Sequence, residues 1–431
     1  KDIAGYIYTS GTTGNPKGVL LSHSNLACNV SAALDVFPIG PENRSLSFLP
    51  WAHSFGQTAE MHTLIAAGAS MGICEGIPKI IDNLAEVQPS ILMAVPNIFN
   101  KIYDGVQKQM AQKPAIIQSL FRNAMRAQTM QKQGKSVSLG DTVSLAIARK
   151  LVYSKIVARF GGKLQFAMSG GAALSKEVAE FVDNLGIMVF EGYGLTETSP
   201  VAAVNTPAAR RIGSVGKPIA GVRIVLDHEA SGSPDEGEIV VYGHNVMQGY
   251  YNLPEESAKV FTPDGGFRTG DLGRFDSDGF LYITGRLKEL YKLENGKYVA
   301  PAALESKLQL SPLILQAMVY GANRPYNVAV LVPDMLALKE WAASQGIDSS
   351  NPNQLVADDR VRARYKQELE TYGKEFKGFE AVRDFILVAE EFTVANDMLT
   401  PKLSMKRRNV LKRYEAEIEA LYAKAPVAKT A

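Results

Sequence analysis

A short segment near the start of the chain constrains its fold and its ligand more than any other. Residues 8–18 read YTSGTTGNPKG, which places three glycines, several hydroxyl side chains and one lysine in one loop. Glycines expose backbone N–H groups, hydroxyls add donors, and Lys17 supplies a compact positive charge. Because the apolar run at residues 3–8 is typical of a strand, the segment predicts a loop that binds a nucleoside triphosphate.

The loop differs from the common phosphate-binding motif of strand–loop–helix proteins. Its glycine-to-lysine spacing is shorter, and Gly18 stands where that motif needs Ser or Thr. A surface turn explains such a composition equally simply, but ten consecutive constrained positions favour the nucleotide loop. The candidate ligands in it are Thr9, Ser10, Gly11, Thr12, Thr13, Gly14 and Lys17.

Four later segments accompany this loop in a fixed order. They are YGLTET at residues 193–198, RTGD at 268–271, GRLKE at 285–289 and a basic stretch around 401–407. Together with the loop they resemble the AMP-forming acyl-CoA synthetases, which are adenylate-forming ligases, from residue 1 to about the C-terminus. Members of that family carry a substantial segment upstream of the loop. The resemblance therefore leads us to expect that this chain lacks its first part.

The predicted fold class is α/β. Residues 3–193 alternate short apolar runs with helical patterns, which favours mostly parallel sheets covered by helices. The strands are expected at 44–49, 70–74 and 91–95, with helices at 22–36 (capped by Ser22 or Ser24) and 80–87. After residue 193 the texture is rich in short strands, which resembles the distorted β-barrel of the family; these segments are 222–226, 238–242, 273–275 and 280–284.

The resemblance also predicts the division into domains. A large AMP-binding domain is expected at residues 1–285, N-terminally incomplete, with the barrel subdomain at about 196–285. A small, mobile α+β domain follows at 286–431, with the hinge near Lys288. Strands at 316–320 and 327–332 alternate with helices in a βαβ-like texture there, and Val410, Tyr414, Ile418 and Leu421 give the last helix one apolar face.

Residues 97–160 form a long helical segment rich in Gln, Lys, Arg and Met, broken near residues 134–140. Composition alone favours a solvated helical hairpin. Within the family, an enlarged helical segment at this position looks like the long-chain fatty acid branch. The segment YKLENGKY at residues 291–298 looks like the same branch.

Composition narrows the function and the compartment. The 46 Lys and Arg balance 44 Asp and Glu, which argues against a nucleic-acid partner recognised by bulk charge. Cys28 and Cys74 lie among apolar neighbours and predict buried free thiols in a reducing compartment. The chain has neither a long apolar run nor a secretory signal, so we expect a cytoplasmic protein. Peripheral contact with the inner face of the membrane, where the protein would collect fatty acid, is compatible with that location.

The resemblance implies a reaction in two halves that uses ATP, Mg²⁺ and coenzyme A. A carboxylate attacks the α-phosphate of ATP to form an acyl-adenylate and pyrophosphate, and a thiol then displaces AMP. Tyr193 is expected against the adenine ring, Thr196 on the α-phosphate and Glu197 on Mg²⁺. The other nucleotide-binding positions that the resemblance implies are Gly170, Gly171, Ala172, Glu191, Gly192, Gly194 and Ile283.

Two charged residues are expected at the nucleotide from the later motifs. Asp271, at the end of a strand-like segment, can accept hydrogen bonds from both ribose hydroxyls, and Arg286 would approach the same nucleotide. A structural ion pair between the two is the alternative. His53, in the segment PWAHSFG, would gate or orient the acyl carboxylate, although a hydrogen-bonded structural histidine fits the sequence as well.

The C-terminal motif departs from the family. A lysine of the family inserts into the site during adenylation, and Ser404 stands at that position here. Lys402, two residues earlier, would project from the same face of an extended segment and replace it. We therefore predict a long-chain fatty acid–CoA ligase. The alternatives are transfer to another acceptor such as acyl carrier protein, an oxygenase of luciferase type, or a weakly active acyl- or nucleotide-binding homologue.

Overall fold

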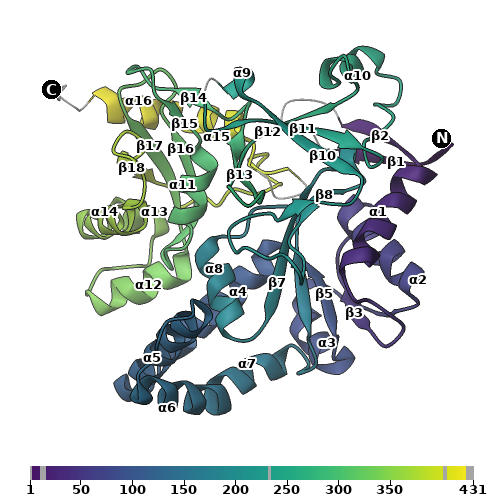
Figure 1. Cartoon of the computed structure of the whole chain (residues 1–431). Coiled ribbons are helices and arrows are strands. Elements are labelled where there is room, and N and C mark those ends of the chain that lie inside the picture. Colours follow the sequence, from purple (N-terminus) through teal and green to yellow (C-terminus); the bar gives the residue numbers. More distant parts are fainter. Residues whose placement is uncertain (1, 10–15, 232–233, 401–404, 424–431) are drawn as a thin grey trace. The chain divides into compact units, whose positions relative to one another are not determined.

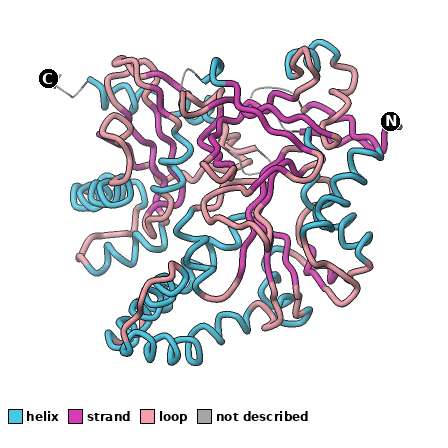
Figure 2. Tube along the Cα trace, viewed as in Figure 1, coloured by secondary structure: helices cyan, strands magenta, loops and turns pink. Residues whose placement is uncertain are grey.

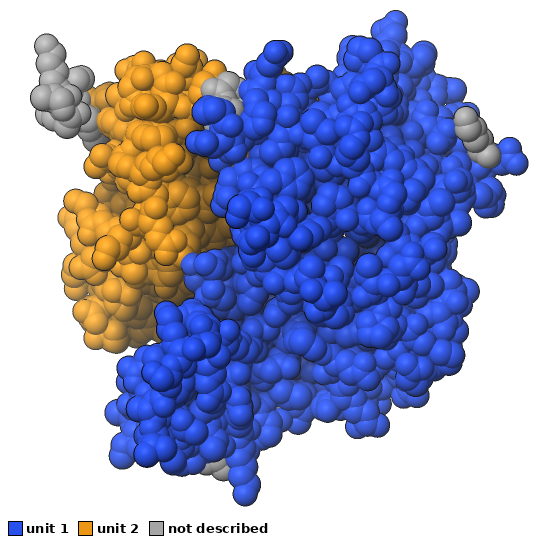
Figure 3. All heavy atoms as spheres, viewed as in Figure 1, with its two compact units in different colours: residues 1–9, 17–269, 273–283 blue, residues 10–16, 270–272, 284–431 orange. Residues whose placement is uncertain are grey.

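The computed structural model describes residues 2–9, 16–231, 234–400 and 405–423. The chain forms two compact units (Figure 3). Unit 1 comprises residues 1–9, 17–269 and 273–283, and unit 2 comprises residues 10–16, 270–272 and 284–431. Sheets flanked by helices make up both units (Figures 1 and 2), as the predicted α/β class requires. The predicted domain boundary at 285/286 and the hinge at Lys288 stay predictions.

Unit 1 opens with an antiparallel hairpin of β1 (Ile3–Thr9) and β2 (Lys17–Ser22), in which Thr9 is opposite Lys17. The helix α1 (His23–Val36) follows at once, with Ser22 as its N-cap. The Ser22 hydroxyl accepts a hydrogen bond from the backbone N–H of Asn25, and the side-chain oxygen of Asn25 accepts one from the backbone N–H of Ser22. The predicted helix and its cap are confirmed.

The central sheet of unit 1 has five strands in the order β5-β6-β7-β8-β9. The first three are parallel, while β8 and β9 extend the sheet antiparallel. A separate parallel pair is formed by β3 (Arg44–Ser47) and β4 (Ser70–Ile73). The five strands are β5 (Ile91–Ala94), β6 (Phe166–Ser169), β7 (Met188–Gly194), β8 (Val201–Val204) and β9 (Lys217–Pro218). The expectation of parallel sheets is therefore confirmed for the strands that helices separate.

Helices pack around these sheets, and α8 contacts both β7 and α4. The short helices near the strands are η1 (Phe55–His62), α2 (Thr63–Ala67), η2 (Ile77–Lys79), α3 (Ile80–Val87), α8 (Lys176–Asn184) and η4 (Thr196–Thr198). The long helical segment contains α4 (Pro96–Ala111), α5 (Ala115–Lys132), α6 (Leu139–Ala148), η3 (Arg149–Tyr153) and α7 (Ser154–Arg159). The sequence indicated the break before α6, but not the earlier one at Gln112–Pro114, where proline stops α4 from continuing.

The strand-rich part of the chain forms a four-stranded sheet in the order β10-β11-β12-β13. Its strands are β10 (Val222–Asp227), β11 (Gly237–Gly243), β12 (Phe267–Phe275) and β13 (Leu281–Arg286), with α9 (His228–Ser231) and α10 (Pro254–Val260) between them. Over the described residues β10 and β13 do not pair, so the expected distorted β-barrel takes the form of an open sheet.

Unit 2 is built on a three-stranded sheet of β16 (Ile314–Tyr320), β17 (Asn327–Pro333) and β18 (Val382–Leu387). The βαβ-like reading of β16 and β17 is wrong, because a short loop joins them as an antiparallel hairpin; only β17 and β18 are parallel. The remaining elements are β14 (Tyr291–Lys292), β15 (Tyr298–Val299), α11 (Pro301–Leu308), α12 (Met335–Ser344), α13 (Pro352–Ala357) and α14 (Asp359–Gly373).

The end of the described chain forms two helices where one was predicted, α15 (Arg407–Arg413) and α16 (Glu415–Ala423). Their apolar residues Val410, Tyr414 and Ile418 are buried in a cluster with the sheet of unit 2, as expected for simple docking. No helix among the residues the structure describes has the length and apolar character needed to span a bilayer. Cys28 and Cys74 are free thiols, but only half-buried.

A buried carboxyl group in unit 1 makes the stability dependent on pH. Glu60 of η1 is inaccessible to solvent and accepts hydrogen bonds from the hydroxyls of Ser45 and Ser47, at 2.9 and 2.8 Å. Burial raises the pKa of Glu60 from 4.5 to about 7, against the lowering effect of these hydroxyls. The folded state therefore binds more protons than the unfolded chain between these pH values, and its stability falls as the pH rises through them.

We predict that Glu60→Gln removes this part of the pH dependence. Relative to the original chain, the variant should gain up to about 3 kcal/mol of unfolding free energy between pH 5 and 8. Denaturant titrations at several pH values measure this difference. The exposed Glu370 serves as the control, and Glu370→Gln should leave the slope unchanged. Equal slopes for Glu60→Gln and the original chain would contradict the prediction.

Candidate functional site

The first sequence-predicted residue of the site, Lys17, lies at the mouth of the β1–β2 hairpin. Residues 10–15 lie outside the described chain, so Ser10, Gly11, Thr12, Thr13 and Gly14 cannot be placed. Thr9 and Lys17 are paired at the two strand ends that lead into this loop. The hairpin therefore holds the two ends of the loop next to each other.

Backbone pairing continues from β2 to residues 248–251. The N–H of Leu20 donates to the Gly249 carbonyl at 2.9 Å, and the N–H of Tyr251 donates to the Gly18 carbonyl at 2.8 Å. This pairing brings Lys17 beside Tyr250, with the ammonium 4.9 Å from the ring centroid. The same ammonium contacts a carboxylate oxygen of Glu256 at 2.6 Å.

Charged and phenolic groups connect Lys17 to the second motif. The Tyr250 hydroxyl donates to Oε1 of Glu197 at 3.0 Å. Burial raises the pKa of Tyr250, and the nearby carboxylates add to this, so the phenol stays protonated and donates. Hydrogen bonds from Lys17 and Lys259 lower the pKa of Glu256 to about 2. The structure thus joins Lys17, Tyr250 and Glu197 in one continuous polar chain.

Glu197 and Thr196 belong to η4, directly after β7, and are 9% and 5% exposed. Thr196 Oγ1 lies 3.5 Å from the hydroxyl of Ser54. The N–H of Met247 donates to the Glu197 carbonyl at 2.9 Å, which holds the backbone of η4 independently of the carboxylate. The turn before η4 needs glycine, since a Cβ on Gly194 would lie 1.8 Å from the Pro200 carbonyl oxygen.

The carboxyl ends of neighbouring parallel strands bring two further predicted segments together. Ala94 and Ser169, at the ends of β5 and β6, are in register with Glu191 of β7. The predicted residues Gly170–Ala172 follow β6, and Gly192 and Tyr193 continue β7 past Glu191. Ligands of open α/β sheets bind at this edge.

Two polar side chains at this edge are buried. The Ser169 hydroxyl has no hydrogen-bond partner among the described residues, which is unusual for a buried polar group. Oε1 of Glu191 accepts from the N–H of Leu174 at 3.0 Å. Burial raises the pKa of Glu191 to about 7 despite this hydrogen bond. The small residues, the Ser169 hydroxyl and the half-buried Tyr193 ring fit a flat, polar group such as a nucleobase.

His53 lies in the turn before η1 and is half-buried. Its Nδ1 accepts a hydrogen bond from the N–H of Phe55 at 3.2 Å, which places the proton of the neutral ring on Nε2. The structural role of His53 is therefore present, and the gating role stays a prediction.

Asp271 and Arg286, both of unit 2, form an ion pair with Nε 3.0 Å from Oδ1. The ion pair that was the alternative interpretation of Asp271 and Arg286 is therefore present. Asp271 is 4% exposed and lies within β12, not at the end of a strand as expected; Gly270 adopts a positive φ of 72° without ending it. Ile283 packs against the core of unit 1, and Lys288 is exposed.

Sequence reasoning missed Tyr250 and Glu256, and it took Ser169 only as one of the small residues of the segment at residues 169–173. Glu256 in the first turn of α10 has the appearance of an ordinary helix-start carboxylate. It is 239 residues from Lys17, so only strand pairing reveals the contact. Lys402 and Ser404 lie outside the described residues, and the adjacent Lys406 forms an ion pair with Asp397.

Residues 1–251 match the profile of the AMP-binding enzyme family, and residues 289–426 match the AMP-binding enzyme C-terminal domain. The chain belongs to the AMP-binding enzymes. This membership confirms the resemblance of the sequence motifs.

Among curated AMP-binding enzymes, the chain is similar to peroxisomal long chain acyl-CoA synthetase 7 of Arabidopsis thaliana (33% identical) and long-chain-fatty-acid–CoA ligase 5 of Rattus norvegicus (33%). It is also similar to long-chain-fatty-acid–CoA ligase FadD15 of Mycobacterium tuberculosis (34%). Each comparison covers 98% of this chain, but only 61%, 62% and 70% of the respective relatives. The chain therefore spans less than two thirds of two of these relatives.

Solved structures of AMP-binding enzymes share the fold. The adenylation domain of a carboxylate reductase from Mycobacterium chelonae superposes with a TM-score of 0.75 at 27% identity, covering 98% of this chain and 60% of that one. The A domain of carboxylic acid reductase from Segniliparus rugosus, in complex with AMP and a co-purified carboxylic acid, gives 0.71 at 26%, covering 98% and 61%.

Proposed function

We propose that this chain activates a fatty acid, of the long-chain class, with ATP. The products of the first step are an acyl-adenylate and pyrophosphate; coenzyme A then displaces AMP to give acyl-CoA. The observation that carries the proposal is the similarity to long-chain fatty acid–CoA ligases along 98% of the chain. The buried polar groups at the carboxyl edge of the central sheet support it.

The adenine ring is proposed to lie at this edge. Tyr193 offers an aromatic face, and the small residues Gly170, Gly171 and Ala172 follow the neighbouring strand β6. The Ser169 hydroxyl, which has no partner in the described chain, is available to the base edge. In this proposal the Asp271 carboxylate accepts hydrogen bonds from the ribose hydroxyls while it stays paired with Arg286.

The triphosphate is proposed to bind the loop at residues 9–17. Carboxylate and α-phosphate are both anions, so the site has to hold them in line and neutralise charge. Lys17 contacts phosphate oxygens once it leaves Glu256, and the Thr196 hydroxyl donates to the α-phosphate. Glu197 suits Mg²⁺, because this ion binds proteins through one or two carboxylates and takes its other ligands from phosphates and water. Bound there, Mg²⁺ would neutralise charge on the phosphates.

The fatty acid is proposed to approach the α-phosphate near His53, whose Nε2–H can orient the carboxylate. The space beside Gly192 and Gly194 is filled by the chain itself, because a Cβ there would lie 3.3 Å from Val204 and 1.8 Å from the Pro200 carbonyl oxygen, so these glycines do not make room for the acyl group. Lys288 is proposed to be the hinge about which the C-terminal domain, residues 286–431, reorients between the half-reactions. Lys402 is proposed to supply the positive charge that Ser404 cannot.

Acid-dependent exchange of labelled pyrophosphate into ATP tests the first half-reaction, and palmitoyl-CoA formation tests the second. We expect both with ATP, Mg²⁺, palmitate and coenzyme A. A chain that binds ATP but shows no exchange would overturn the proposal. If Ser404→Lys then restored exchange, the chain would be the weakly active acyl- or nucleotide-binding homologue.

A second acceptor is favoured by one comparison. The A-PCP didomain of the carboxylic acid reductase from Segniliparus rugosus also superposes on this chain, with a TM-score of 0.71. The assay of acyl transfer, repeated with acyl carrier protein in place of coenzyme A, distinguishes the two acceptors. Exchange with palmitate, followed by an acyl group on carrier protein and no acyl-CoA, would establish the alternative.

A further inference from the structure

The helical segment of unit 1 carries an excess of positive charge that the net charge of the complete chain does not reveal. Between Asp104 and Glu177 there are twelve Lys and Arg and a single acidic residue, Asp141, although the complete chain has a net charge of only +2. The basic residues are Lys108, Lys113, Arg122, Arg126, Lys132, Lys135, Arg149, Lys150, Lys155, Arg159, Lys163 and Lys176. The rest of the chain is therefore net negative, and this segment is an electrostatically separate surface.

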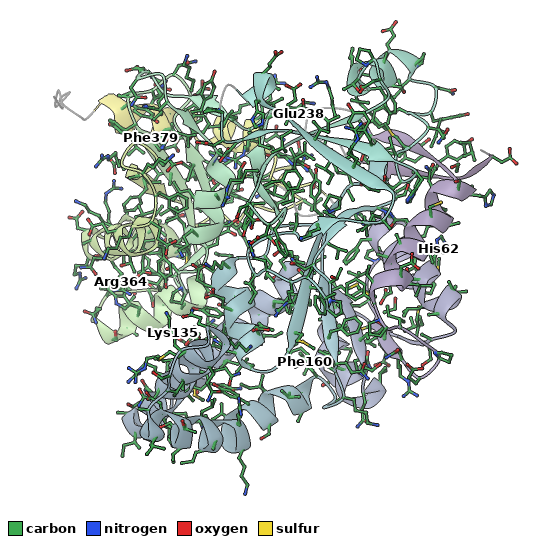
Figure 4. The ribbon with its side chains drawn as sticks, viewed as in Figure 1. His62, Lys135, Phe160, Glu238, Arg364 and Phe379 are labelled. Carbon is green, nitrogen blue, oxygen red and sulfur yellow. The ribbon has the colours of Figure 1, made fainter. Side chains whose placement is uncertain are left out.

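Some of these charges are engaged within unit 1. Asp141 pairs with Arg126 at 3.0 Å, and Lys132 pairs with Asp183. Arg122, Lys135 and Lys150 are exposed, and in the described chain none of them forms an ion pair with an acidic side chain. Lys135 lies in the turn between α5 and α6 (Figure 4). These three residues leave strong positive charge facing solvent.

The helix α6 also presents an apolar stripe to solvent. Leu139, Val143 and Ile147 follow one another at four-residue spacing and are 87%, 57% and 40% exposed. Residues of the opposite face, Leu145 and Ala148, are buried, and α6 packs against α5. A helix that is apolar on both faces is normally buried completely. The exposed stripe therefore needs an apolar surrounding that unit 1 does not provide.

We propose that α6 and the flanking basic residues dock this protein on an anionic lipid surface. In the docked state Leu139, Val143 and Ile147 enter the headgroup–acyl boundary, while Arg122, Lys135 and Lys150 contact lipid phosphates. Lys150 lies in η3, two residues after the end of α6, so its long side chain can follow the apolar surface and place its ammonium among the headgroups.

The occupant is a membrane rather than another macromolecule for two reasons. A nucleic acid backbone offers no apolar surface for the α6 stripe. A protein groove that binds a basic amphipathic helix encloses more than one of its faces, whereas the Leu145 face of α6 is occupied by α5. A flat lipid surface, in contrast, contacts only one face of a helix, and α6 has one face exposed. Docking depends on this surface alone and not on the proposed ligase reaction.

Co-sedimentation of the full chain with vesicles tests the proposal. We expect binding to phosphatidylcholine vesicles that contain 30% phosphatidylserine, and much weaker binding to phosphatidylcholine alone. Each of Arg122→Glu and Lys150→Glu should lower the partition coefficient at least fivefold, because one cation near an anionic surface contributes about that factor. Val143→Asp/Ile147→Asp should lower it more than tenfold, while 0.5 M salt weakens binding of the original chain.

Matched controls come from α12 of unit 2. Leu336 is 67% exposed and Lys339 is exposed on the same helix, so Leu336→Asp and Lys339→Glu change equivalent residues elsewhere. Both should bind vesicles like the original chain. Equal binding by the α6 variants and these controls would overturn the proposal, as would binding of the segment to acyl carrier protein or DNA but not to vesicles. Thermal unfolding confirms that each variant is folded, and pyrophosphate exchange with palmitate in solution reports the proposed reaction separately.

Discussion

Replacing the buried carboxylate of Glu197 by an amide should lower the rate of palmitate-dependent pyrophosphate exchange by 10²- to 10³-fold. Glu197→Gln keeps the shape of the side chain, and the backbone hydrogen bond from Met247 to residue 197 remains. The amide, however, has one acceptor oxygen and no charge with which to hold Mg²⁺ beside the triphosphate. A loss of about 3–4 kcal/mol of transition-state stabilisation is typical when one preorganised electrostatic contact is removed.

Two observations distinguish this role from a structural one. The Mg²⁺ concentration that gives half-maximal exchange should rise in Glu197→Gln, whereas thermal unfolding without ligands should change little. Tyr250→Phe is the matched variant, because it keeps the ring beside Lys17 and removes only the hydroxyl that donates to Glu197. It should lower exchange about tenfold, as expected for one hydrogen bond to a charged group. Full exchange activity in Glu197→Gln would exclude Glu197 from the proposed site.

The largest effect on stability is expected in unit 2, where Arg407→Met should destabilise the protein by about 3–5 kcal/mol. Two guanidinium nitrogens of Arg407 contact the two carboxylate oxygens of Glu305, the first at 2.7 Å. The N–H of Val319 also donates to Glu305, at 2.6 Å. Glu305 is 6% exposed, and burial raises its pKa. Methionine would leave this carboxyl without its cation in the interior.

Urea unfolding monitored within unit 2, for example by the fluorescence of Trp341, measures the change. Lys406→Met is the control at the neighbouring position. Lys406 pairs with the exposed Asp397, and such surface pairs contribute about 0–1 kcal/mol. The double variant Arg407→Met/Glu305→Gln should recover part of the loss, because the buried charge is removed together with its partner. A single variant as stable as the Lys406→Met control would show that solvent reaches Glu305.

Much of the fold could be predicted because the signals are local. The Ser22 cap and the helix it starts depend on residues within one turn, and α3 ends where predicted, at Val87. The motifs at residues 193–198 and 268–271 were recognised because their residue types lie side by side in the chain. The placement of residues 193–198 at the end of β7 also follows from alternating strands and helices, whereas residues 268–271 lie within β12.

The errors arose where contacts between distant residues decide the structure. Alternation of apolar residues identifies β16 and β17 as strands, but it does not give their direction, and the short loop between them produced a hairpin. Asp271 was expected to end a strand, yet β12 continues through it to Phe275, because pairing with the neighbouring strands holds its backbone extended. The distorted β-barrel implied by the family takes the form of an open sheet among the described residues.

The sequence by itself determined the family, the α/β class and the chemical types of the candidate ligands, since these depend on short runs of residues in a fixed order. Only the tertiary structure decided which side chains meet: Lys17 with Glu256, Tyr250 with Glu197, and Asp271 with Arg286. It also decided which polar and apolar groups lost or kept their contact with water, such as the buried Ser169 hydroxyl and the exposed stripe of α6. Strand pairing and packing join residues hundreds of positions apart, and no local pattern records those contacts.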